Sequence, residues 1–454
     1  MTSAFFSDLL SSIADRTRLL LGRREWNVAP AQRAASLIDL CTALVSGRGE
    51  ASGIAMAQEI LDRYQDLDGP ARLTFFETLA EKFGPDHARL KHVVAAWVSE
   101  PSADLSADLH YLSEPRRQEL FRRLNRAPGA TAALVRMRAD LLALRRDHPA
   151  LAPVDRDAAH LLASWFNRGF LVLRRIDWST PAIVLEKIIR YEAVHEIRGW
   201  DDLRRRIDPD DRRCYAFFHP ALIDEPLIFV EVALTEDMPA AIAPLLAADR
   251  SAAPLARTRT AVFYSISNCQ RGLAGISFGN FLIKQVVEEL RRELPKLETF
   301  VTLSPAPDFM AWLKRQTNLL SPDDAVRIEN PDPQWAEASE ETIRLRRIIE
   351  PLAGEYFLKA KLPDGRPLDA VARFHLGNGA RLERINWPGD CSPRAMRESA
   401  GLMVNYLYDL DEIEKNHEAY ANHGKIAASS GVRRLLKAET RPRLPAAQPA
   451  PDAG

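Results

Sequence analysis

The hydrophobic pattern of this 454-residue chain changes once, between about residues 150 and 175. Before that point apolar residues recur at helical spacing, as from Phe5 to Ile13 and from Leu37 to Leu44, and period-two alternation is almost absent. Residues 71–83 lie between two Gly-Pro pairs, which are typical helix start and stop signals. No fixed-period repeat is found. We therefore expect residues 1–165 to form an all-helical domain, built as a bundle or an array of helix pairs.

Beyond this point the sequence is typical of strands mixed with helices. Residues Phe281–Leu294 predict an amphipathic helix, because apolar residues recur along one face. We expect an α+β fold, with a mixed α/β domain over residues 166–440 and a disordered, Pro/Ala-rich tail over residues 441–454. Short β-branched and aromatic runs between turn residues predict strands at Cys214–His219, Leu227–Leu234, Ala261–Ser267 and Thr299–Leu303.

Two further segments decide where several polar candidates lie. Residues Val371–Trp387 contain two strand-like runs around Gly377-Asn378-Gly379, which predicts a hairpin. Ser392-Pro393 is typical of the cap and first residue of a helix, which we expect to run to about Leu410. These predictions put His375 on a strand, and Asn405 and Tyr408 on a helix.

Charge and hydropathy exclude several classes of protein. The chain holds 61 Lys+Arg and 62 Asp+Glu residues, a net charge of −1, so it carries no chain-wide basic field for nucleic acid or an anionic membrane. No apolar run reaches the roughly 18 residues that a transmembrane helix needs. The N-terminus places acids before a basic pair, unlike a signal peptide, and the C-terminus matches no targeting address. We expect a cytoplasmic protein.

Cysteine and histidine spacing argues against a disulfide scaffold and against a metal site. The ten histidines include no HxxxH or HExxH pair, and no cysteine lies near His375, so we expect no metal. The cysteines share no CxxC spacing and are too few for a scaffold, although one intersubunit disulfide stays open; they are Cys41, Cys214, Cys269 and Cys391.

A glycine-rich segment joins the strand that ends near Ser267 to the helix that opens at about Gly279. Gly272, Gly275 and Gly279 would let backbone N–H groups approach an anion, and the helix N-terminus adds its positive dipole end, which suits a pyrophosphate. The segment is neither a Walker A loop nor a GxGxxG fingerprint. A plain strand–helix turn would need the same glycines, so the segment is ambiguous alone.

Four polar side chains are candidates with two interpretations each. Ser304 precedes Pro305, so it is either a turn or cap residue or a reactive hydroxyl at the carboxyl end of a strand. His375 is either a structural histidine or a proton-transfer group. Asn405 and Tyr408 are either core residues or groups that orient the others.

Taken jointly, seven segments resemble the malonyl-CoA decarboxylase family in order and closely in spacing. The resemblance extends from about Trp178 to the mid-430s, and the helical half fits more loosely through Ser164-Trp-Phe and Gly169-Phe-Leu. The segments are Phe263-Tyr-Ser-Ile-Ser, Gln270-Arg-Gly-Leu-Ala-Gly, Gly279-Asn-Phe-Leu-Ile-Lys, Leu303-Ser-Pro-Ala-Pro, Asn378-Gly-Ala, Arg384-Ile-Asn-Trp and Gly401-Leu-Met-Val-Asn-Tyr.

The resemblance implies a catalytic domain like the GNAT acetyltransferases, which bind coenzyme A through backbone amides between a central strand and a helix. Ser277 departs from the acidic residue expected in animal-type enzymes, which leaves backbone binding intact and puts a role of that side chain in doubt. The implied contacts are Ala274, Gly275, Ile276, Ser277, Phe278, Gly279 and Asn280, with Ile283 on the first turn of the helix.

The resemblance also implies a reaction, the decarboxylation of malonyl-CoA to acetyl-CoA and CO₂ by a dyad of Ser304 and His375, within fatty acid metabolism. Coenzyme A is part of the substrate, and the thioester is the electron sink, so no metal or other cofactor is expected. His375 would polarise the thioester oxygen and supply or relay a proton, and Ser304 would hold the malonyl carboxylate and share that proton. The two side chains should lie about 2.6–3.2 Å apart, with Asn405 and Tyr408 as secondary candidates.

Two other function classes remain open. A GNAT-type acyl-CoA-dependent acyltransferase would move an acyl group to an amine. A coenzyme A-binding or helical scaffold protein would keep the fold without the chemistry. In each case we expect the helical domain to mediate self-association, because it groups no polar residues at a chemically useful spacing.

Overall fold

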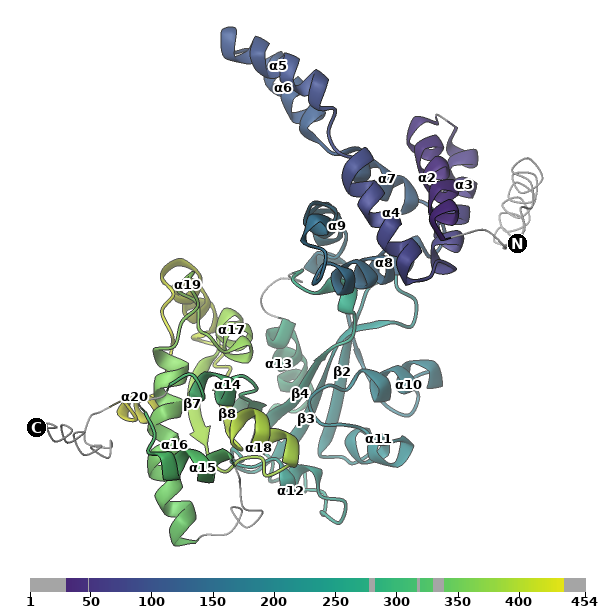
Figure 1. Ribbon diagram of the computed structural model, residues 1–454. Coiled ribbons are helices and arrows are strands. Elements are labelled where there is room, and N and C mark those ends of the chain that lie inside the picture. The colour runs from purple at the N-terminus through teal and green to yellow at the C-terminus, as the bar shows by residue number, and fades with distance from the viewer. Residues whose placement is uncertain (1–29, 48, 277–281, 317–318, 330–338, 437–454) are drawn as a thin grey trace, which may run out of the picture. The chain divides into compact units, whose positions relative to one another are not determined.

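A computed structural model describes residues 30–47, 49–276, 282–316, 319–329 and 339–436 of the chain. These residues group into two compact units (Figure 1). The helical unit holds the described residues up to 171 together with 219–225 and 270–276. The sheet unit holds the remaining described residues.

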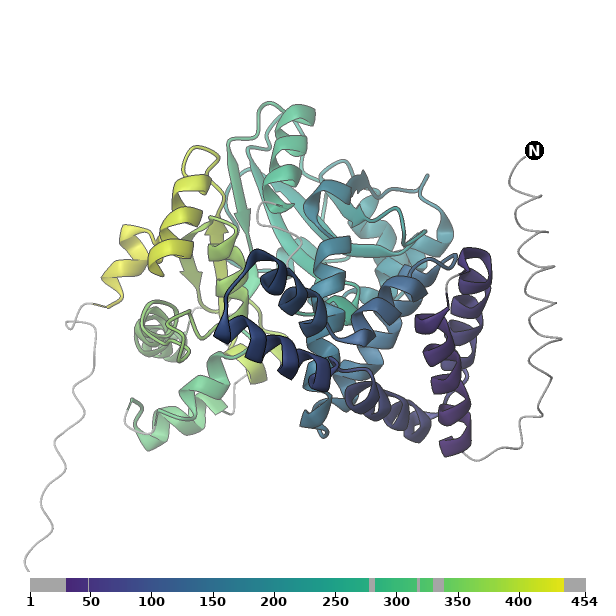
Figure 2. The same cartoon turned by 90° about the horizontal axis from the view of Figure 1, so that it is seen from above.

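The helical unit buries the apolar faces of its helices in one core, which includes Cys41, Phe75 and Leu134. Asp68 caps α4 by accepting a hydrogen bond from the Ala71 N–H at 3.0 Å. The predicted all-helical N-terminal region is confirmed for the described residues, and the predicted face from Phe5 to Ile13 lies outside them. Helices α2 and α3 lie antiparallel beside each other (Figure 2). The elements are α2 (Pro30–Ser46), α3 (Glu50–Gln65), α4 (Gly69–Lys82), α5 (His87–Ser99), α6 (Ala103–Ser113), α7 (Arg116–Leu124), α8 (Ala130–Leu144), α9 (Ala152–Trp165) and the 3-10 turns η1 (Pro149–Leu151), η2 (Arg168–Phe170) and η3 (Arg271–Leu273).

The sheet unit is built on one mixed sheet with strand order β1-β2-β3-β4-β5-β8-β6, in which β7 also pairs with β8. The predicted strands around residues 214, 227, 261 and 299 are confirmed as β2 to β5, with ends shifted by a residue or two. The strands are β1 (Val172–Arg175), β2 (Arg212–Phe218), β3 (Pro226–Thr235), β4 (Thr260–Asn268), β5 (Thr299–Thr302), β6 (Ser304–Pro305), β7 (Arg381–Asn386) and β8 (Met403–Leu407).

Helices cover this sheet, and α10 and α11 bury apolar side chains against β2 and β3. The predicted order of a helical region followed by a mixed α/β domain is confirmed. The helices of the sheet unit are α10 (Ala182–Tyr191), α11 (Trp200–Ile207), α12 (Ala243–Leu246), α13 (Leu282–Glu293), α14 (Phe309–Leu313), α15 (Pro322–Glu329), α16 (Glu340–Leu358), α17 (Ala370–Gly377), α18 (Pro393–Ser399), α19 (Ile413–His423) and α20 (Ser430–Arg434).

Strands β4 and β5 run parallel, and the helix α13 predicted from its apolar face connects them. A parallel pair needs such a crossover, whereas β1 to β4 are joined by antiparallel pairing. The parallel register runs from Thr260 opposite Thr299 to Phe263 opposite Thr302. The register of β4 with β5 ends at Thr302, and Ser304 then pairs with Val404 of β8.

His375 lies on helix α17, so the predicted strand and hairpin over residues 371–379 are wrong. Asp369 starts the helix by accepting a hydrogen bond from the Ala372 N–H at 2.7 Å. The apolar run behind this cap is too short to show a helical period clearly. Gly379, with φ of 82°, then turns the chain into β7, which confirms only the second predicted strand.

The start of α18 confirms the predicted cap. Ser392 accepts a hydrogen bond from the Ala395 N–H at 3.2 Å, and Pro393 occupies the first helical position. The helix nevertheless ends at Ser399, so its predicted extension to about Leu410 is wrong.

Two left-handed residues end α18. Ala400 and Gly401 have φ values of 51° and 77°, a conformation that stops a helix. Strand β8 follows directly, so Asn405 lies on a strand and Tyr408 lies just beyond its end rather than on a helix.

Two further expectations concern membrane-spanning helices and disulfide bonds. No described helix is both long enough and apolar enough to cross a membrane. No disulfide joins the four cysteines among the described residues, and three of them are buried whereas Cys391 is exposed.

Candidate functional site

Ser304 and His375 form a hydrogen-bonded pair in the sheet unit. Ser304 begins β6, His375 lies in the last turn of α17, and the Oγ and Nε2 atoms are 3.0 Å apart. Both side chains are buried. The predicted approach of two residues that are 71 positions apart is confirmed. Their catalytic role stays a prediction.

The alternation of side chains along the strands explains how Ser304 comes close to His375. Thr302 and Ser304 lie two residues apart on an extended segment, so they point to one face of the sheet. The pairing of β6 with β8 puts Tyr406 and Tyr408 on that same face. Helix α17 covers it, and the Tyr406 ring stacks on the His375 ring at 4.6 Å between centroids.

The second ring nitrogen of His375, Nδ1, lies within hydrogen-bond distance of the Tyr408 hydroxyl. The distance between Nδ1 and the phenol oxygen is 2.8 Å. Burial lowers the pKa of His375 to about 3 and raises the pKa of Tyr408 well above its ordinary value, because a low dielectric disfavours the charged form of each. Both groups are therefore uncharged at neutral pH, and Tyr408 makes the contact that a histidine-orienting role requires.

Two residues of this cluster were missed by sequence reasoning. Ser304 Oγ donates a hydrogen bond to Thr302 Oγ1 at 2.9 Å, and the Tyr406 N–H donates to the same oxygen at 3.1 Å. The strand period of two could have pointed to Thr302, which precedes Ser304 by two residues. Tyr406 gave no such signal, because its stacking depends on the register of β8.

Asn405 has a different environment from the other secondary candidate. Its side chain accepts hydrogen bonds from Arg384 at 3.1 Å and Asn386 at 2.8 Å, and it donates to the Thr302 carbonyl at 2.8 Å. Among the described residues these bonds run to β5 and β7, not to the side chains of the dyad. Asn405 therefore connects strands behind the site.

The predicted coenzyme A contacts are described only in part. Ser277, Phe278, Gly279 and Asn280 lie outside the described residues. Ala274 and Gly275 are exposed, and Gly275 has φ of 77° with no atom within 4 Å of the position a Cβ would take. The side chains of Ile276 and Ile283 are buried, so they pack into the protein.

Gly272 is explained by packing rather than by an anion. A Cβ there would overlap the Val135 carbonyl oxygen of α8. The Gly272 carbonyl accepts a hydrogen bond from the buried Arg138 at 2.6 Å, and Arg138 also pairs with Asp155 at 2.8 Å. Within the helical unit, α8 therefore fixes the first glycine of the motif.

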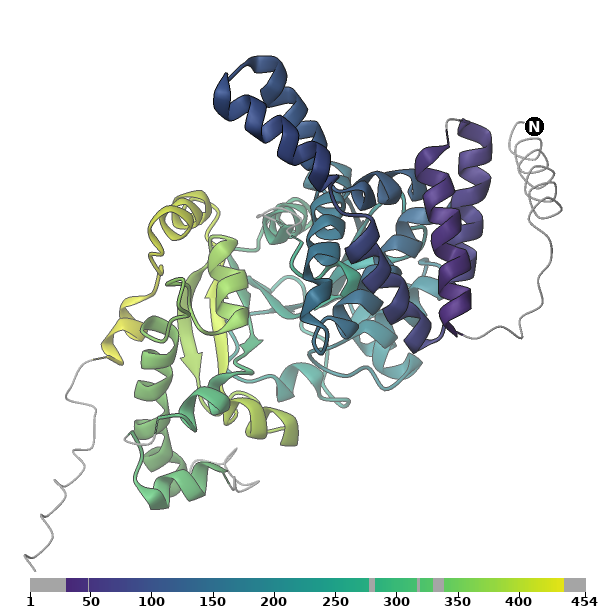
Figure 3. The ribbon, with the colours of Figure 1, turned by 45° about the horizontal axis from the view of Figure 1, so that its top comes forward.

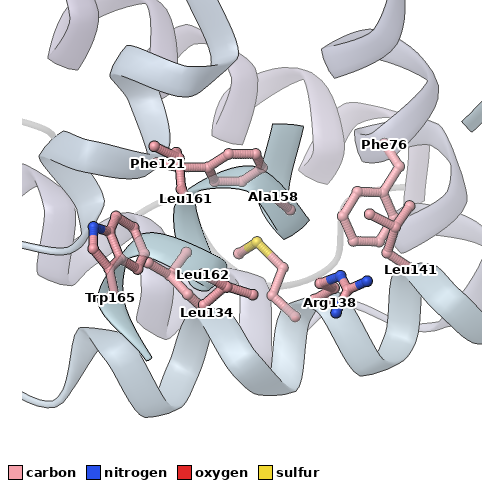
Figure 4. A pocket seen from close by; sticks show the side chains of 10 residues that line it. Phe76, Phe121, Leu134, Arg138, Leu141, Ala158, Leu161, Leu162 and Trp165 are labelled. Carbon is pink, nitrogen blue, oxygen red and sulfur yellow. The ribbon is translucent and has the colours of Figure 1, made fainter. Parts of the chain in front are cut away.

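A small apolar cavity lies beside Arg138 (Figure 4). It encloses about 10 Å³, with Trp165 and Arg138 toward opposite ends. A water molecule needs roughly this much space and two to four polar partners. Since Arg138 is already paired with Asp155, the cavity is a packing gap and not a substrate site.

A cavity of about 880 Å³ lies in the sheet unit. Pro305 and Val371, which neighbour Ser304 and His375 in their elements, line it. Six arginines and four acidic residues line the cavity. Glu231 and Asp211, which lie outside the lining, pair with Arg206 and Arg250, so the negative charges balance the positive ones. The charged lining consists of Arg198, Arg205, Arg206, Arg212, Arg250 and Arg394 with Glu196, Asp202, Asp390 and Glu398.

Models of two domains of one protein family match the chain. The malonyl-CoA decarboxylase C-terminal domain matches residues 169–446, and the malonyl-CoA decarboxylase N-terminal domain matches residues 83–166. The mitochondrial malonyl-CoA decarboxylase of Anser anser anser is 36% identical over 413 residues, covering 82% of each chain. That of Rattus norvegicus is 33% identical over 450 residues, covering 91% of this chain and 87% of the relative.

Solved structures agree with these matches. The crystal structure of malonyl-CoA decarboxylase from Rhodopseudomonas palustris is 58% identical, with a TM-score of 0.85, and covers 88% of this chain and 99% of that chain. The structure of malonyl-CoA decarboxylase from Agrobacterium vitis is 54% identical, with a TM-score of 0.83, and covers 88% and 100%.

Proposed function

The chain belongs to the malonyl-CoA decarboxylase family, and from this premise we propose that it converts malonyl-CoA into acetyl-CoA and CO₂ at Ser304 and His375. The observation that carries the proposal is the 3.0 Å hydrogen bond between Ser304 Oγ and His375 Nε2 inside the matched C-terminal domain. A buried hydroxyl–imidazole pair offers preorganised donors where charge develops in the reaction.

The proposed reaction breaks the bond between the carboxylate carbon and the adjacent CH₂ group. The carboxylate leaves as CO₂, the electron pair of the broken bond forms the enolate of the thioester, and a proton then adds to the carbon. The thioester takes up the electron pair, so the proposed mechanism calls for no cofactor beyond the coenzyme A of the substrate. The protein must stabilise the enolate more strongly than the substrate.

His375 acts in this proposal as an uncharged donor. Since burial lowers the pKa of the ring to about 3, its N–H polarises the thioester oxygen as a neutral imidazole and supplies or relays the proton. A positioned acid of this kind contributes roughly 10²–10⁴-fold to the rate. When substrate binds, Ser304 turns its hydroxyl from Thr302 to the malonyl carboxylate, and it shares the proton with His375.

The proposed contact for the coenzyme A pyrophosphate is the segment 274–280. Support comes from the exposed Ala274 and Gly275 and from the open space beside Gly275. The Ala274 and Ile276 N–H groups already bond to the Arg271 and Leu273 carbonyls at 3.1 and 3.0 Å, so the Gly275 N–H is the described donor that suits a phosphate oxygen. The N-terminus of α13 follows in the sequence. The buried side chain of Ile283 leaves the backbone of that first turn for ligand contact.

Self-association of two copies through the helices α5 and α6 is also proposed. Neither helix buries a residue, and Val98 and Tyr111 are 69% and 75% exposed. Figure 3 shows the pair extending away from the other helices of its unit. Exposed apolar side chains gathered on one helix pair are typical of a protein–protein contact.

A cytoplasmic location and a place in fatty acid metabolism are further parts of the proposal. The location is supported by the exposed cysteine Cys391, whose thiol a reducing compartment preserves. The goose and rat relatives carry mitochondrial names, so fractionation of cells that express this chain must distinguish the two compartments.

Purified protein incubated with malonyl-CoA and no acceptor tests the function. We expect acetyl-CoA and CO₂ to form in equal amounts. An acyltransferase would require an amine, and a scaffold protein would bind coenzyme A without turnover. His375→Asn, measured in parallel, controls for contaminating decarboxylase, since its product formation should collapse.

A further inference from the structure

The hydrogen bonds around Thr302 decide where the Ser304 proton points. Thr302 Oγ1 accepts the Tyr406 N–H at 3.1 Å, and its own proton faces the Val404 carbonyl at 3.5 Å. Its remaining acceptor position takes the hydroxyl of Ser304 at 2.9 Å. The Ser304 proton is therefore directed along the strand to Thr302.

With its proton engaged, Ser304 can only accept a hydrogen bond from His375. A hydroxyl has one proton to donate and two lone pairs. The 3.0 Å contact between Ser304 Oγ and His375 Nε2 then requires an N–H at Nε2. The opposite nitrogen, Nδ1, carries a lone pair that accepts the Tyr408 hydroxyl at 2.8 Å.

The other tautomer would leave buried groups without partners. An N–H at Nδ1 would donate to Tyr408, whose own proton would then need another acceptor. In the part of the chain that the structure describes, the Tyr408 hydroxyl bonds to His375 alone. Ser304 would also have to turn its proton from Thr302 to Nε2. Buried donors without acceptors are strongly disfavoured.

We propose that Thr302 is a positioning residue that, through the Ser304 hydroxyl, holds His375 in the tautomer with its proton on Nε2. That tautomer aims the ring N–H at the Ser304 side of the site, where the substrate needs a donor. Thr302 acts only through Ser304. The catalytic consequence rests on the proposed function, whereas the tautomer is a property of the resting protein.

Nitrogen NMR of the full chain labelled with ¹⁵N-histidine tests the tautomer without substrate. The His375 signals are those that His375→Asn removes. At pH 7 we expect a protonated Nε2 and an unprotonated Nδ1. A protonated Nδ1 with an unprotonated Nε2 would overturn the proposal, and this measurement needs no variant of Thr302 that folds.

A pair of variants tests the role of the threonine hydroxyl. Thr302→Val keeps the shape and removes the hydroxyl, so the ring proton should shift toward Nδ1 and kcat should fall roughly 10- to 100-fold. The KM for malonyl-CoA should stay close to that of the unchanged protein. Thr302→Ser keeps the hydroxyl and should restore the spectrum and most of kcat.

Two outcomes of the variant experiment contradict the proposal. One is an unchanged spectrum and kcat in Thr302→Val, and the other is an equal loss in Thr302→Val and Thr302→Ser. If the unchanged protein produces no acetyl-CoA from malonyl-CoA, the proposed function fails. The spectrum of the resting protein still decides the tautomer in that case.

Discussion

Tyr406 and His375 lie ring against ring, with centroids 4.6 Å apart and 24° between the ring planes. Phe374 and Tyr408 approach the same imidazole edge to face, at 5.1 and 6.0 Å. These aromatic groups exclude water from the ring, and burial alone lowers its pKa to about 3. The packing thus keeps the imidazole uncharged, as the proposed reaction requires.

The first prediction is a pH dependence of stability that His375 carries. The unfolded chain takes up a proton on this ring near the ordinary pKa of about 6.5, whereas the folded protein takes it up only near pH 3. Between these values the unfolded state binds more protons, so the free energy of unfolding falls as the pH falls. His375→Asn should therefore lose less Tm between pH 7 and pH 5 than the unchanged protein.

An exposed histidine provides the control for this measurement. His160 lies on α9 with its side chain in solvent, and His160→Asn should keep the original pH slope of Tm. Equal slopes for His375→Asn and the unchanged protein would show that the ring titrates normally.

The second prediction separates the two members of the dyad. His375→Asn should lower kcat by roughly 10²–10⁴-fold, the contribution of a positioned acid. Ser304→Ala should cost less, because the imidazole N–H remains. Both variants should bind acetyl-CoA with unchanged affinity in calorimetry, since the proposed pyrophosphate contact lies elsewhere in the sequence. Near-normal decarboxylation by His375→Asn would refute the assignment.

The sequence predicted the element that carries Ser304 better than the element that carries His375. Ser304 follows a strand that the sequence shows clearly, and the family resemblance paired it with His375. The helix around His375 was missed because its apolar run is short, although its cap, Asp369, was visible in the sequence. A cap search over short apolar runs would have found this helix.

The rest of the site depends on tertiary pairing. Every residue of β8 from Met403 to Tyr406 is buried, so its sequence lacks the alternation that marks a half-exposed strand. Gly401 was the visible signal that α18 stops. The stacking of Tyr406 on His375 and the bond from Ser304 to Thr302 require the register of three strand segments, which no local pattern specifies.

The third prediction concerns Gly275 and ligand charge. Gly275→Ala and Gly275→Asp both incur left-handed strain of up to about 1–2 kcal/mol, less for the aspartate, and both project into open space. Only the aspartate adds a negative charge near the proposed pyrophosphate. The KM for malonyl-CoA should therefore rise much more in Gly275→Asp than in Gly275→Ala at similar Tm. Equal KM values would remove this segment from the coenzyme A site.

The fourth prediction concerns Gly272 and packing. A Cβ at this position would overlap the Val135 carbonyl of α8, so Gly272→Ala should destabilise the protein by about 1–3 kcal/mol. The loss should appear as a lower Tm, larger than that of Gly275→Ala. A Gly272→Ala protein with the original Tm would mean that α8 gives way freely at this contact.

The fifth prediction concerns the helix pair α5 and α6. Val98 and Tyr111 lie in solvent within each copy, so the double variant Val98→Glu, Tyr111→Glu should leave the fold of each copy and kcat unchanged. If two copies meet through this pair, charges at these positions must be desolvated or repel each other across the contact. Light scattering on the eluting protein should then show a lower molar mass. Ser99→Glu, at the exposed polar position that ends α5, should keep the original mass. An unchanged mass in the double variant would assign self-association to another surface.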